Sequence, residues 1–311
     1  MTTSALHQPV LPNDVIAFLA PKESNTIIDA TVGCGGHSSL ILKANPKVKL
    51  IGIDRDINAL EEAKKVLSAY GEQVQLIRAR FSEIPQVLKD NNPEKVDGIL
   101  MDIGMSSLQL DTADRGFSLR LKGPLDMRMD SRDSITASQI LNSWSEKDIA
   151  DIFWKYGEEK ASRRIAREIV KRRDEKPLVY TDELADLINN LTRSPRKSRL
   201  PAATRCFQAL RIAVNNELQE LEKGLSAAVE CLNPKGKLVV ISFHSLEDRI
   251  VKNFMREQAK ECICPPGMPE CRCEKESTLK ILTKKPVQAD KNEIENNRRA
   301  ACAKLRAAEK I

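Results

Sequence analysis

The sequence predicts an α/β fold in which a mostly parallel sheet is interrupted by a long helical insertion. Between residues 26 and 103, short β-branched runs alternate with helical patterns, as is typical of a parallel sheet covered by helices on both faces. From residue 111 to residue 214 the apolar residues recur at helical spacing instead. A chain of 311 residues, 41% of them hydrophobic, is long enough to form one large domain or two smaller ones.

Strands and helices alternate in the first part of the chain. The expected strands are Thr26–Gly33, Lys49–Asp54, Val74–Ala79 and Val96–Ile103. The helices between them cover Ser38–Ala44, about Asn58 to Ala69, and a short stretch that ends near Asp90.

The insertion is expected to be helical, and the α/β pattern is expected to resume after it. Candidate helices are Ser145–Tyr156, Lys160–Arg173 and Thr181–Leu191, with Thr181 as an N-cap. A long helix over Gln208–Cys231, a turn at Asn233–Gly236 and a strand at Lys237–Phe243 follow. The predicted domains are therefore 1–110 together with 215–311, and the insertion 111–214.

The C-terminal part gives a weaker pattern. Leu246–Gln258 is predicted to be a helix and Thr278–Thr283 a strand. Ala300–Glu309 is helical by propensity, with a final antiparallel strand as the alternative.

Composition narrows the class of protein. No stretch approaches the roughly 20 apolar residues that would span a bilayer, and the N-terminus lacks the features of a secretory signal or transit peptide. We therefore expect a cytoplasmic protein that does not associate with membranes. Only 4% of the residues are aromatic, which argues against extensive stacking of bases on aromatic side chains.

The formal net charge of +6 is concentrated in the insertion. Such runs are often solvated helix faces, but a long run without acidic residues beside a candidate site favours a polyanionic partner. The basic residues of the two runs are Arg163, Arg164, Arg167, Lys171, Arg172 and Arg173, then Arg193, Arg196, Lys197, Arg199, Arg205 and Arg211.

A glycine-rich turn follows the first expected strand, in the sequence DATVGCGGH (Asp29–His37). Glycines there allow a tight turn and let a ligand approach main-chain N–H groups. Asp54 ends the second strand roughly 20 residues later, where a carboxylate can bind a ribose diol. NAD enzymes share this geometry, but the turn lacks the third glycine of G-x-G-x-x-G. A carboxylate at Asp29 also suits an ammonium and a sulfonium better than a pyrophosphate, so the site favours S-adenosylmethionine.

The fourth strand ends in Asp102, and Ser106 and Ser107 follow shortly after. Strand ends at this edge of an open α/β sheet commonly carry function. The functional interpretation places Asp102 beside the cofactor and the incoming substrate, and the alternative is a capping Asp with ordinary turn residues.

Several motifs together resemble the bacterial ribosomal RNA small subunit methyltransferase H, or MraW, family, nearly end to end and in the same order. They are HQPVL (His7–Leu11), DATVGCGGHS (Asp29–Ser38), GIDRD (Gly52–Asp56), DGILMDIGMSSLQLD (Asp97–Asp111), RGFSLRLKGPLDMRMD (Arg115–Asp130), YGEEKASRRIAREI (Tyr156–Ile169), ATRCFQALRIAVNNEL (Ala203–Leu218) and ISFHSLEDRIVKNFM (Ile241–Met255). One departure is ENNRRAACAKLRAAE (Glu295–Glu309), where the family's proline is absent and its serine is replaced by Cys302.

The resemblance implies a Rossmann-like class I methyltransferase with a helical insertion. It implies that S-adenosylmethionine is the cofactor and that N4 of a decoding-centre cytosine of 16S rRNA (position 1402 in the usual numbering of that RNA) is methylated, in the small ribosomal subunit. It favours a final strand over a helix in the tail. The cofactor-contacting positions that it implies are Gly35, Gly36, His37, Asp54, Phe81, Asp102 and Gln109.

Methyl transfer to a cytosine amine requires alignment of donor and acceptor and an acceptor for the amine hydrogens. Asp102 is the first candidate for this acceptor, although the cofactor role competes with it, and Ser106 and Ser107 could position the base. Asp126 and Arg128 are further candidates, with a structural loop as the alternative. The target base must leave its stack, and the basic insertion could hold its phosphates. The residues predicted for that grip are Arg193, Arg196, Lys197 and Arg199.

Two other features remain open. His244 follows the fifth strand, where a structural role is the commoner one. Cys262, Cys264, Cys271 and Cys273 could chelate zinc, but their spacing is C-x-C rather than C-x-x-C, so a mobile loop of reduced thiols is favoured and no metal is expected.

The competing functions are an enzyme acting on DNA, another RNA or a protein, a ribosome-assembly factor with a vestigial cofactor pocket, and an NAD-dependent enzyme. The sequence leaves the oligomeric state open, with a homodimer among the alternatives.

Overall fold

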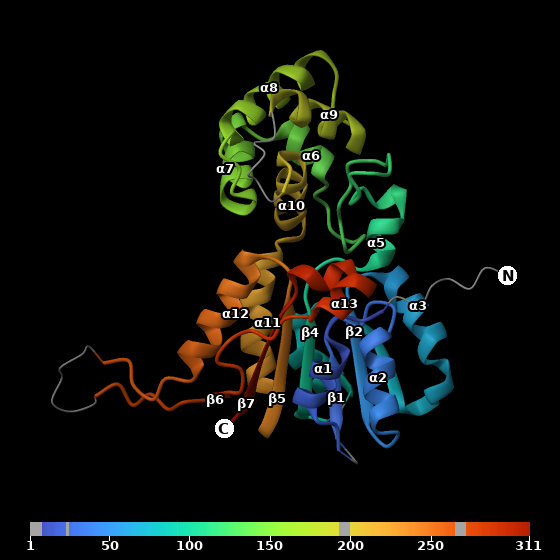
Figure 1. Cartoon of the computed structure of the whole chain (residues 1–311), viewed down its shortest axis with the longest axis vertical. Coiled ribbons are helices and arrows are strands. Elements are labelled where there is room, and N and C mark those ends of the chain that lie inside the picture. The colour runs from blue at the N-terminus through green and yellow to red at the C-terminus, as the bar shows by residue number, and fades with distance from the viewer. Residues whose placement is uncertain (1–7, 23–24, 92, 193–199, 265–271) are drawn as a thin grey trace. The chain divides into compact units, whose positions relative to one another are not determined.

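A computed structural model describes residues 8–22, 25–91, 93–192, 200–264 and 272–311. The chain divides into two units (Figure 1). The first comprises Met1–Gly104 and Leu218–Ile311, and the second comprises Met105–Glu217. The second unit is thus inserted between two parts of the first, and its boundaries fall slightly outside the limits 111 and 214 expected from the sequence.

A seven-stranded sheet forms the centre of the first unit, in the order β3-β2-β1-β4-β5-β7-β6. Neighbouring strands from β3 through β5 pair in parallel, whereas β7 is antiparallel to both β5 and β6. This is a mostly parallel, Rossmann-like sheet, so the predicted α/β fold class is confirmed. The strands are β1 (Thr26–Asp29), β2 (Lys49–Asp54), β3 (Val74–Arg78), β4 (Val96–Asp102), β5 (Leu232–Ser242), β6 (Leu279–Ile281) and β7 (Lys304–Lys310).

Helices connect the strands of the first unit. None of the described helices is long and apolar enough to cross a membrane. The helices are α1 (Pro12–Leu19), α2 (Gly36–Ala44), α3 (Ile57–Leu67), α4 (Ile84–Asn91), α11 (Glu217–Cys231), α12 (Ser245–Gln258) and α13 (Lys291–Asn296).

Each face of the sheet has its own hydrophobic core. In β4, Ile99 and Met101 belong to one core with Leu225 of α11, whereas Leu100 between them belongs to the other core with Leu42 of α2. Successive strand residues point to opposite faces. A strand that is apolar at nearly every position is therefore what a sheet covered on both faces requires.

The second unit is built from helices around a separate core, in which Phe153 and Ile165 are fully buried. Within its described residues, β pairing is limited to an isolated bridge between Pro124 and Tyr180. The helices are α5 (Ser107–Asp111), α6 (Ala137–Ser143), α7 (Glu146–Gly157), α8 (Ser162–Glu175), α9 (Thr181–Leu191) and α10 (Ala202–Asn215).

The prediction of a single helix over Gln208–Cys231 is wrong. Helix α10 ends at Asn215 and α11 begins at Glu217. Between them, Asn216 adopts the left-handed conformation, with φ of 49° and ψ of 38°. Asparagine tolerates this conformation better than most residues and can end a helix, and the apolar periodicity continues across it, so the pattern alone did not reveal the break.

The C-terminal tail is a strand, and its helical propensity was misleading. Arg298–Cys302 form a 3₁₀ turn, and β7 then pairs antiparallel to β5, with Leu305 opposite Ile241. Pairing with a neighbouring strand outweighs a local preference of a few tenths of a kcal/mol per residue. The alternative prediction of a final antiparallel strand is confirmed.

Two local expectations are also wrong. Thr181 is the first residue of α9 rather than its N-cap; its hydroxyl accepts a hydrogen bond from Gly123 N (3.1 Å) and donates one to Leu121 O (3.0 Å). The turn expected at Asn233–Gly236 lies inside β5, where Lys235 has a φ of 67° and the register with β4 shifts.

Candidate functional site

Three acidic residues end three adjacent parallel strands of the first unit: Asp29 on β1, Asp54 on β2 and Asp102 on β4. The carboxyl ends of parallel strands meet at one edge of a sheet, which is where open α/β folds bind ligands. The sequence therefore brings three carboxylates to this edge, and the structure gives each one a different role.

The glycine turn connects this edge to α2. Gly33 and Gly35 have φ of 51° and 86°, in the left-handed region that glycine adopts without cost. A Cβ on Gly35 would lie 3.2 Å from Leu67 Cγ, so the Leu67 side chain would have to shift by a few tenths of an ångström to admit one. Gly33 N donates a hydrogen bond to Asp54 Oδ2 (2.9 Å), which fixes the turn to the end of β2.

Asp54 is held by main-chain donors and keeps acceptor capacity for a ligand. Its Oδ1 accepts from Asp56 N at 2.9 Å, in addition to the bond from Gly33. Part of the Asp54 side chain still reaches solvent. Burial nevertheless raises the pKa of this carboxyl to about 6, because the effect of burial is larger than the opposing effect of the two hydrogen bonds. Each carboxylate oxygen can accept a second hydrogen bond, which fits the predicted binding of a ribose diol.

Asp29, which was expected to attract a positively charged group of the cofactor, is buried at the end of β1. It is 1% exposed, and it accepts hydrogen bonds from the Ser38 hydroxyl (2.7 Å) and from Thr31 N (3.3 Å). Burial raises the pKa of its carboxyl. Asp29 is thus a positioning residue that joins the end of β1 to the first turn of α2.

His37 and Asp102 form a pair that the sequence did not reveal. His37 Nε2 lies 3.5 Å from Asp102 Oδ2. Burial opposes protonation of His37, but the nearby Asp102 carboxylate, with the charges of Asp29 and Glu293, raises its pKa. The described residues provide no hydrogen-bond partner for the buried Oδ1 of Asp102 or for either ring nitrogen of His37. Buried polar atoms are rarely left in this state, so the pair marks a position where a bound water or a ligand is expected.

Thr31 and Gly104 also shape the end of β4, and sequence reasoning missed both. Thr31 Oγ1 accepts a hydrogen bond from Asp102 N at 2.6 Å, which ties the end of β4 to the chain after β1. Gly104 has a φ of 124°, and a Cβ there would lie 3.3 Å from the Phe243 ring. A glycine two residues after Asp102, Gly104, was the sequence signal that could have predicted this turn.

Phe81, predicted beside the cofactor, follows β3 at the same edge but is largely buried, with 9% exposure. It belongs to the core that includes Met101. Its ring edge faces α11, where a Cβ on Gly224 would lie 2.2 Å from Phe81 Cδ2. The structure therefore gives Phe81 a packing role in addition to the predicted one.

Ser106, Ser107 and Gln109 belong to the second unit, at the start of α5. Ser106 Oγ accepts a hydrogen bond from Gln109 N and Gln109 Oε1 accepts one from Ser106 N, both at 3.2 Å. This reciprocal cap gives Ser106 and the buried Gln109 a structural role. Asp126 and Arg128 similarly form a local ion pair at 2.7 Å, and Arg128 also donates to Asp133 O, as the structural-loop alternative predicts.

The predicted phosphate grip, Arg193, Arg196, Lys197 and Arg199, lies outside the described residues, as do His7 and Cys271. Within the described part of the second unit, α8 carries the other basic run, and four of its cations are exposed: Arg163, Arg164, Arg167 and Lys171. Arg211 instead forms a buried ion pair with Glu217 (2.8 Å), and Arg173 donates to the carbonyls of Leu141 and Trp144.

His244 caps α12, as the structural interpretation predicts. Its Nδ1 accepts a hydrogen bond from Glu247 N at 3.4 Å, while Glu247 Oε2 accepts from the main-chain N of Phe243 (2.8 Å) and of His244 (3.2 Å). Glu247 is 1% exposed. The pair therefore fixes the chain where β5 passes into α12.

Comparison with known proteins identifies the family. A model of the MraW methylase family matches residues 4–311. This chain belongs to the MraW methylase family. A protein of Heliobacterium mobile named ribosomal RNA small subunit methyltransferase H is 49% identical over 308 residues, which are 98% of this chain and 99% of that protein. A protein of the same name from Carboxydothermus hydrogenoformans is 48% identical over 98% of each chain. The family predicted from the motifs is confirmed.

Solved structures were compared as well. An rRNA methylase from Streptococcus thermophilus has a TM-score of 0.42 and 10% identity, and the match covers 96% of this chain and 93% of that one. A Streptococcus mutans protein in complex with SAH has a TM-score of 0.43 and 12% identity, with 96% and 98% covered. At such scores the fold class rests on the strand order of the MraW chain itself.

Proposed function

We propose that this MraW-family chain transfers the methyl group of S-adenosylmethionine to N4 of a cytosine in the decoding centre of 16S rRNA. The names of its relatives support the small ribosomal subunit as the source of the substrate. The observation that carries the proposal is the buried Oδ1 of Asp102, an acceptor without a hydrogen-bond partner among the described residues, at the carboxyl end of β4. A cytosine amine supplies the hydrogen that this oxygen lacks.

The cofactor is assigned to the edge of the sheet beside the glycine turn. Asp54 would bind the ribose hydroxyls, since its two oxygens retain lone pairs. Gly35 and Gly36 would let the cofactor approach the start of α2, where main-chain N–H groups are available. His37 has two buried nitrogens that a ligand could satisfy. S-adenosylmethionine supplies an electrophilic methyl group, and the protein supplies the alignment. Phe81 and Gln109 complete the set by resemblance to the family.

Asp102 is proposed to accept a hydrogen of the cytosine amine. The amine lone pair is delocalised into the ring, so a carboxylate that accepts one of its hydrogens raises the electron density on nitrogen. As nitrogen would bond the methyl carbon, the bond between that carbon and the cofactor's sulfur would break to leave S-adenosylhomocysteine, and the amine proton would pass to the carboxylate. Thr31 holds Asp102 N, and His37 stands beside Oδ2, so Oδ1 is the oxygen left for the substrate. Ser106 and Ser107 remain proposed to position the base.

The helical unit is proposed to hold the RNA. Cations on protein helices bind phosphates without reading sequence, and α8 exposes Arg163, Arg164, Arg167 and Lys171. The basic residues Arg193, Arg196, Lys197 and Arg199 would extend this grip. A target base must be extruded from its stack to reach the methyl group, and phosphate contacts on both sides of that nucleotide would hold the backbone in the extruded state.

The test is transfer of labelled methyl from S-adenosylmethionine to small subunits that lack the modification, followed by mass spectrometry of the product nucleosides. N4-methylcytidine at the decoding-centre position is expected. Label in a different nucleoside, or in ribosomal protein, would refute the proposed acceptor. Failure to bind S-adenosylhomocysteine would refute the cofactor assignment itself.

A further inference from the structure

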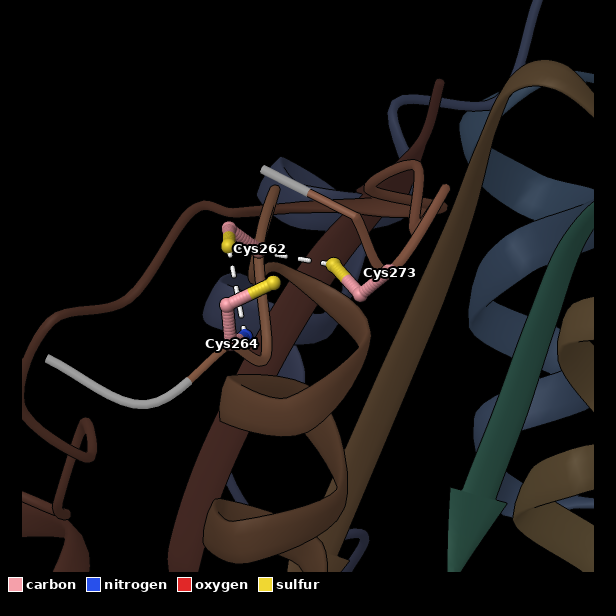
Figure 2. A group of neighbouring side chains, drawn as sticks. All are labelled: Cys262, Cys264 and Cys273. Carbon is pink, nitrogen blue, oxygen red and sulfur yellow. Dashed lines mark hydrogen bonds between the residues drawn. The ribbon is translucent and has the colours of Figure 1, made fainter. Parts of the chain in front are cut away.

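Three cysteine side chains converge in the first unit, away from the strand ends that carry the candidate site. Cys262 and Cys264 lie shortly after α12, and Cys273 lies shortly before β6. Their sulfur atoms all lie within 4.8 Å of one another. Figure 2 shows the three sulfurs gathered between two separate stretches of the chain. The methyl-transfer proposal uses none of these residues, so their convergence requires its own explanation.

The sulfur geometry fits ligands of one metal ion. Cys262 Sγ and Cys273 Sγ are 3.7 Å apart. Zinc binds thiolates at about 2.3 Å in a tetrahedral arrangement, which places two sulfurs of one site about 3.8 Å apart. A disulfide would require about 2.05 Å, so the observed separation matches shared coordination and not a covalent bond.

Main-chain amides point at all three sulfurs. Cys264 N donates to Cys262 Sγ (3.3 Å), Ile263 N donates to Cys273 Sγ (3.4 Å), and Arg272 N donates to Cys264 Sγ (3.4 Å). Hydrogen bonds to a charged acceptor stabilise the charged form. Thiolate is the form of cysteine that binds metal, and such outer hydrogen bonds orient the ligands of protein metal sites.

We propose that Cys262, Cys264 and Cys273 bind a zinc ion. Soft thiolate ligands select zinc over magnesium or calcium, and Cys262 is exposed while the other two are partly exposed, which leaves an entry path for the ion. The C-x-C spacing, which had argued against a metal, is compatible with zinc because the chain turn between Cys262 and Cys264 brings their sulfurs together. Cys271 lies outside the described residues, and the proposal rests on the other three.

The site is structural in character. A bound ion would join the chain that leaves α12 to the chain that enters β6, which lies at the edge of the sheet and, among the described strands, pairs with β7. Such cross-links stabilise the folded state because the ligands are not preassembled in the unfolded chain. Zinc is therefore expected to stabilise this edge and to have no part in methyl transfer.

The test is metal analysis of the full-length protein purified with a phosphine reductant and without chelators. Mass spectrometry should find about one zinc per chain in wild type and less than about one-tenth of that in Cys262→Ser, Cys264→Ser and Cys273→Ser. Cys302→Ser is the matched control, because Cys302 is exposed and lies outside the cluster, and it should retain its zinc. Cobalt added to the apoprotein should give thiolate charge-transfer bands in wild type and Cys302→Ser only.

A second measurement does not depend on whether the variants fold. A strong chelator should lower the melting temperature of the wild-type protein by at least about 2 °C. The proposal is overturned if wild type contains no zinc and shows no cobalt–thiolate band. It is equally overturned if Cys302→Ser loses as much zinc as the cluster variants, or if iron or copper is bound in place of zinc.

Discussion

The proposal that Asp54 binds the cofactor can be tested through the pH dependence of the affinity for S-adenosylhomocysteine. Its carboxylate accepts hydrogen bonds from Gly33 N and Asp56 N, both at 2.9 Å, and burial raises its pKa to about 6. Hydrogen bonds from a ribose diol favour the ionised carboxylate. Binding of the cofactor product S-adenosylhomocysteine should therefore displace the proton that Asp54 carries at low pH, and affinity should rise with pH.

The magnitude follows from the pKa. With a pKa of about 6, about one-tenth of Asp54 is ionised at pH 5, so binding of S-adenosylhomocysteine should be about tenfold weaker at pH 5 than at pH 8. Asp54→Asn removes this contribution. It should also weaken binding at pH 8 by about 10- to 150-fold, because a hydrogen bond to a charged group contributes about 1.5–3 kcal/mol.

Isothermal titration calorimetry across pH 5–8 measures both effects. Asp97→Asn is the matched control, because Asp97 Oδ2 accepts a hydrogen bond from Thr26 N at 2.9 Å near the opposite ends of β4 and β1. This control should keep the wild-type affinity within about twofold and keep the pH slope. Any pH dependence of the affinity that comes from His37 should persist in both Asp54→Asn and Asp97→Asn. An Asp54→Asn protein that retains the full tenfold slope would refute the reasoning.

Three further predictions concern the turn, the buried pair and the helical unit. Gly35→Ala should lower the free energy of unfolding in urea by more than about 2 kcal/mol, because about 1–2 kcal/mol of left-handed strain adds to the pressure of the new Cβ on Leu67 at 3.2 Å. A loss of about 2 kcal/mol or less would contradict the packing part of this prediction. The pKa of His37 is raised above 6.5, so its stabilising effect is present below pH 6.5 and is lost as pH rises through the folded-state pKa. The stability difference between wild type and His37→Gln should therefore be larger at pH 6 than at pH 9, and a difference that grows with pH would show the opposite sign. Arg163→Glu with Arg164→Glu should raise KM for small subunits by about tenfold or more at low salt and leave S-adenosylhomocysteine affinity unchanged, whereas an equal effect of Lys64→Glu on α3 would argue against a local RNA grip.

The central sheet was predictable because burial on both faces leaves a strong local signal. Lys49–Asp54 is a run of β-branched and apolar residues that ends in a carboxylate, and β2 has those bounds. The tail, by contrast, depends on a partner that is distant in sequence. Lys304–Lys310 is rich in alanine and charged residues, and it becomes a strand because β5 offers its edge.

The candidate site was predictable in its position but not in the roles of its members. The glycine turn and the ends of β1, β2 and β4 could be placed because parallel strands share one carboxyl edge. The role of Asp29 could not be inferred, because Ser38 meets it only once α2 has folded against β1. The pair of His37 with Asp102 likewise joins two segments whose distance the sequence does not encode.

The cysteine cluster is another group of side chains whose distances the sequence does not give. Spacing within CICPPGMPECRC argued against a metal site, because the usual zinc pattern is C-x-x-C. A metal site depends on the separation of the sulfur atoms in space. That separation follows from the fold of the chain, in which the main-chain amides of residues 263, 264 and 272 donate hydrogen bonds to the sulfurs.

The most direct test of the account is single-turnover methyl transfer by wild type and Asp102→Asn on unmodified small subunits, with S-adenosylhomocysteine affinity measured on the same samples. If Oδ1 of Asp102 accepts the amine hydrogen, the rate of N4-methylcytidine formation should fall by about 10²-fold or more, while the affinity changes by less than about tenfold. A rate that falls only in proportion to the affinity would contradict this account and leave Asp102 as a cofactor-binding residue alone.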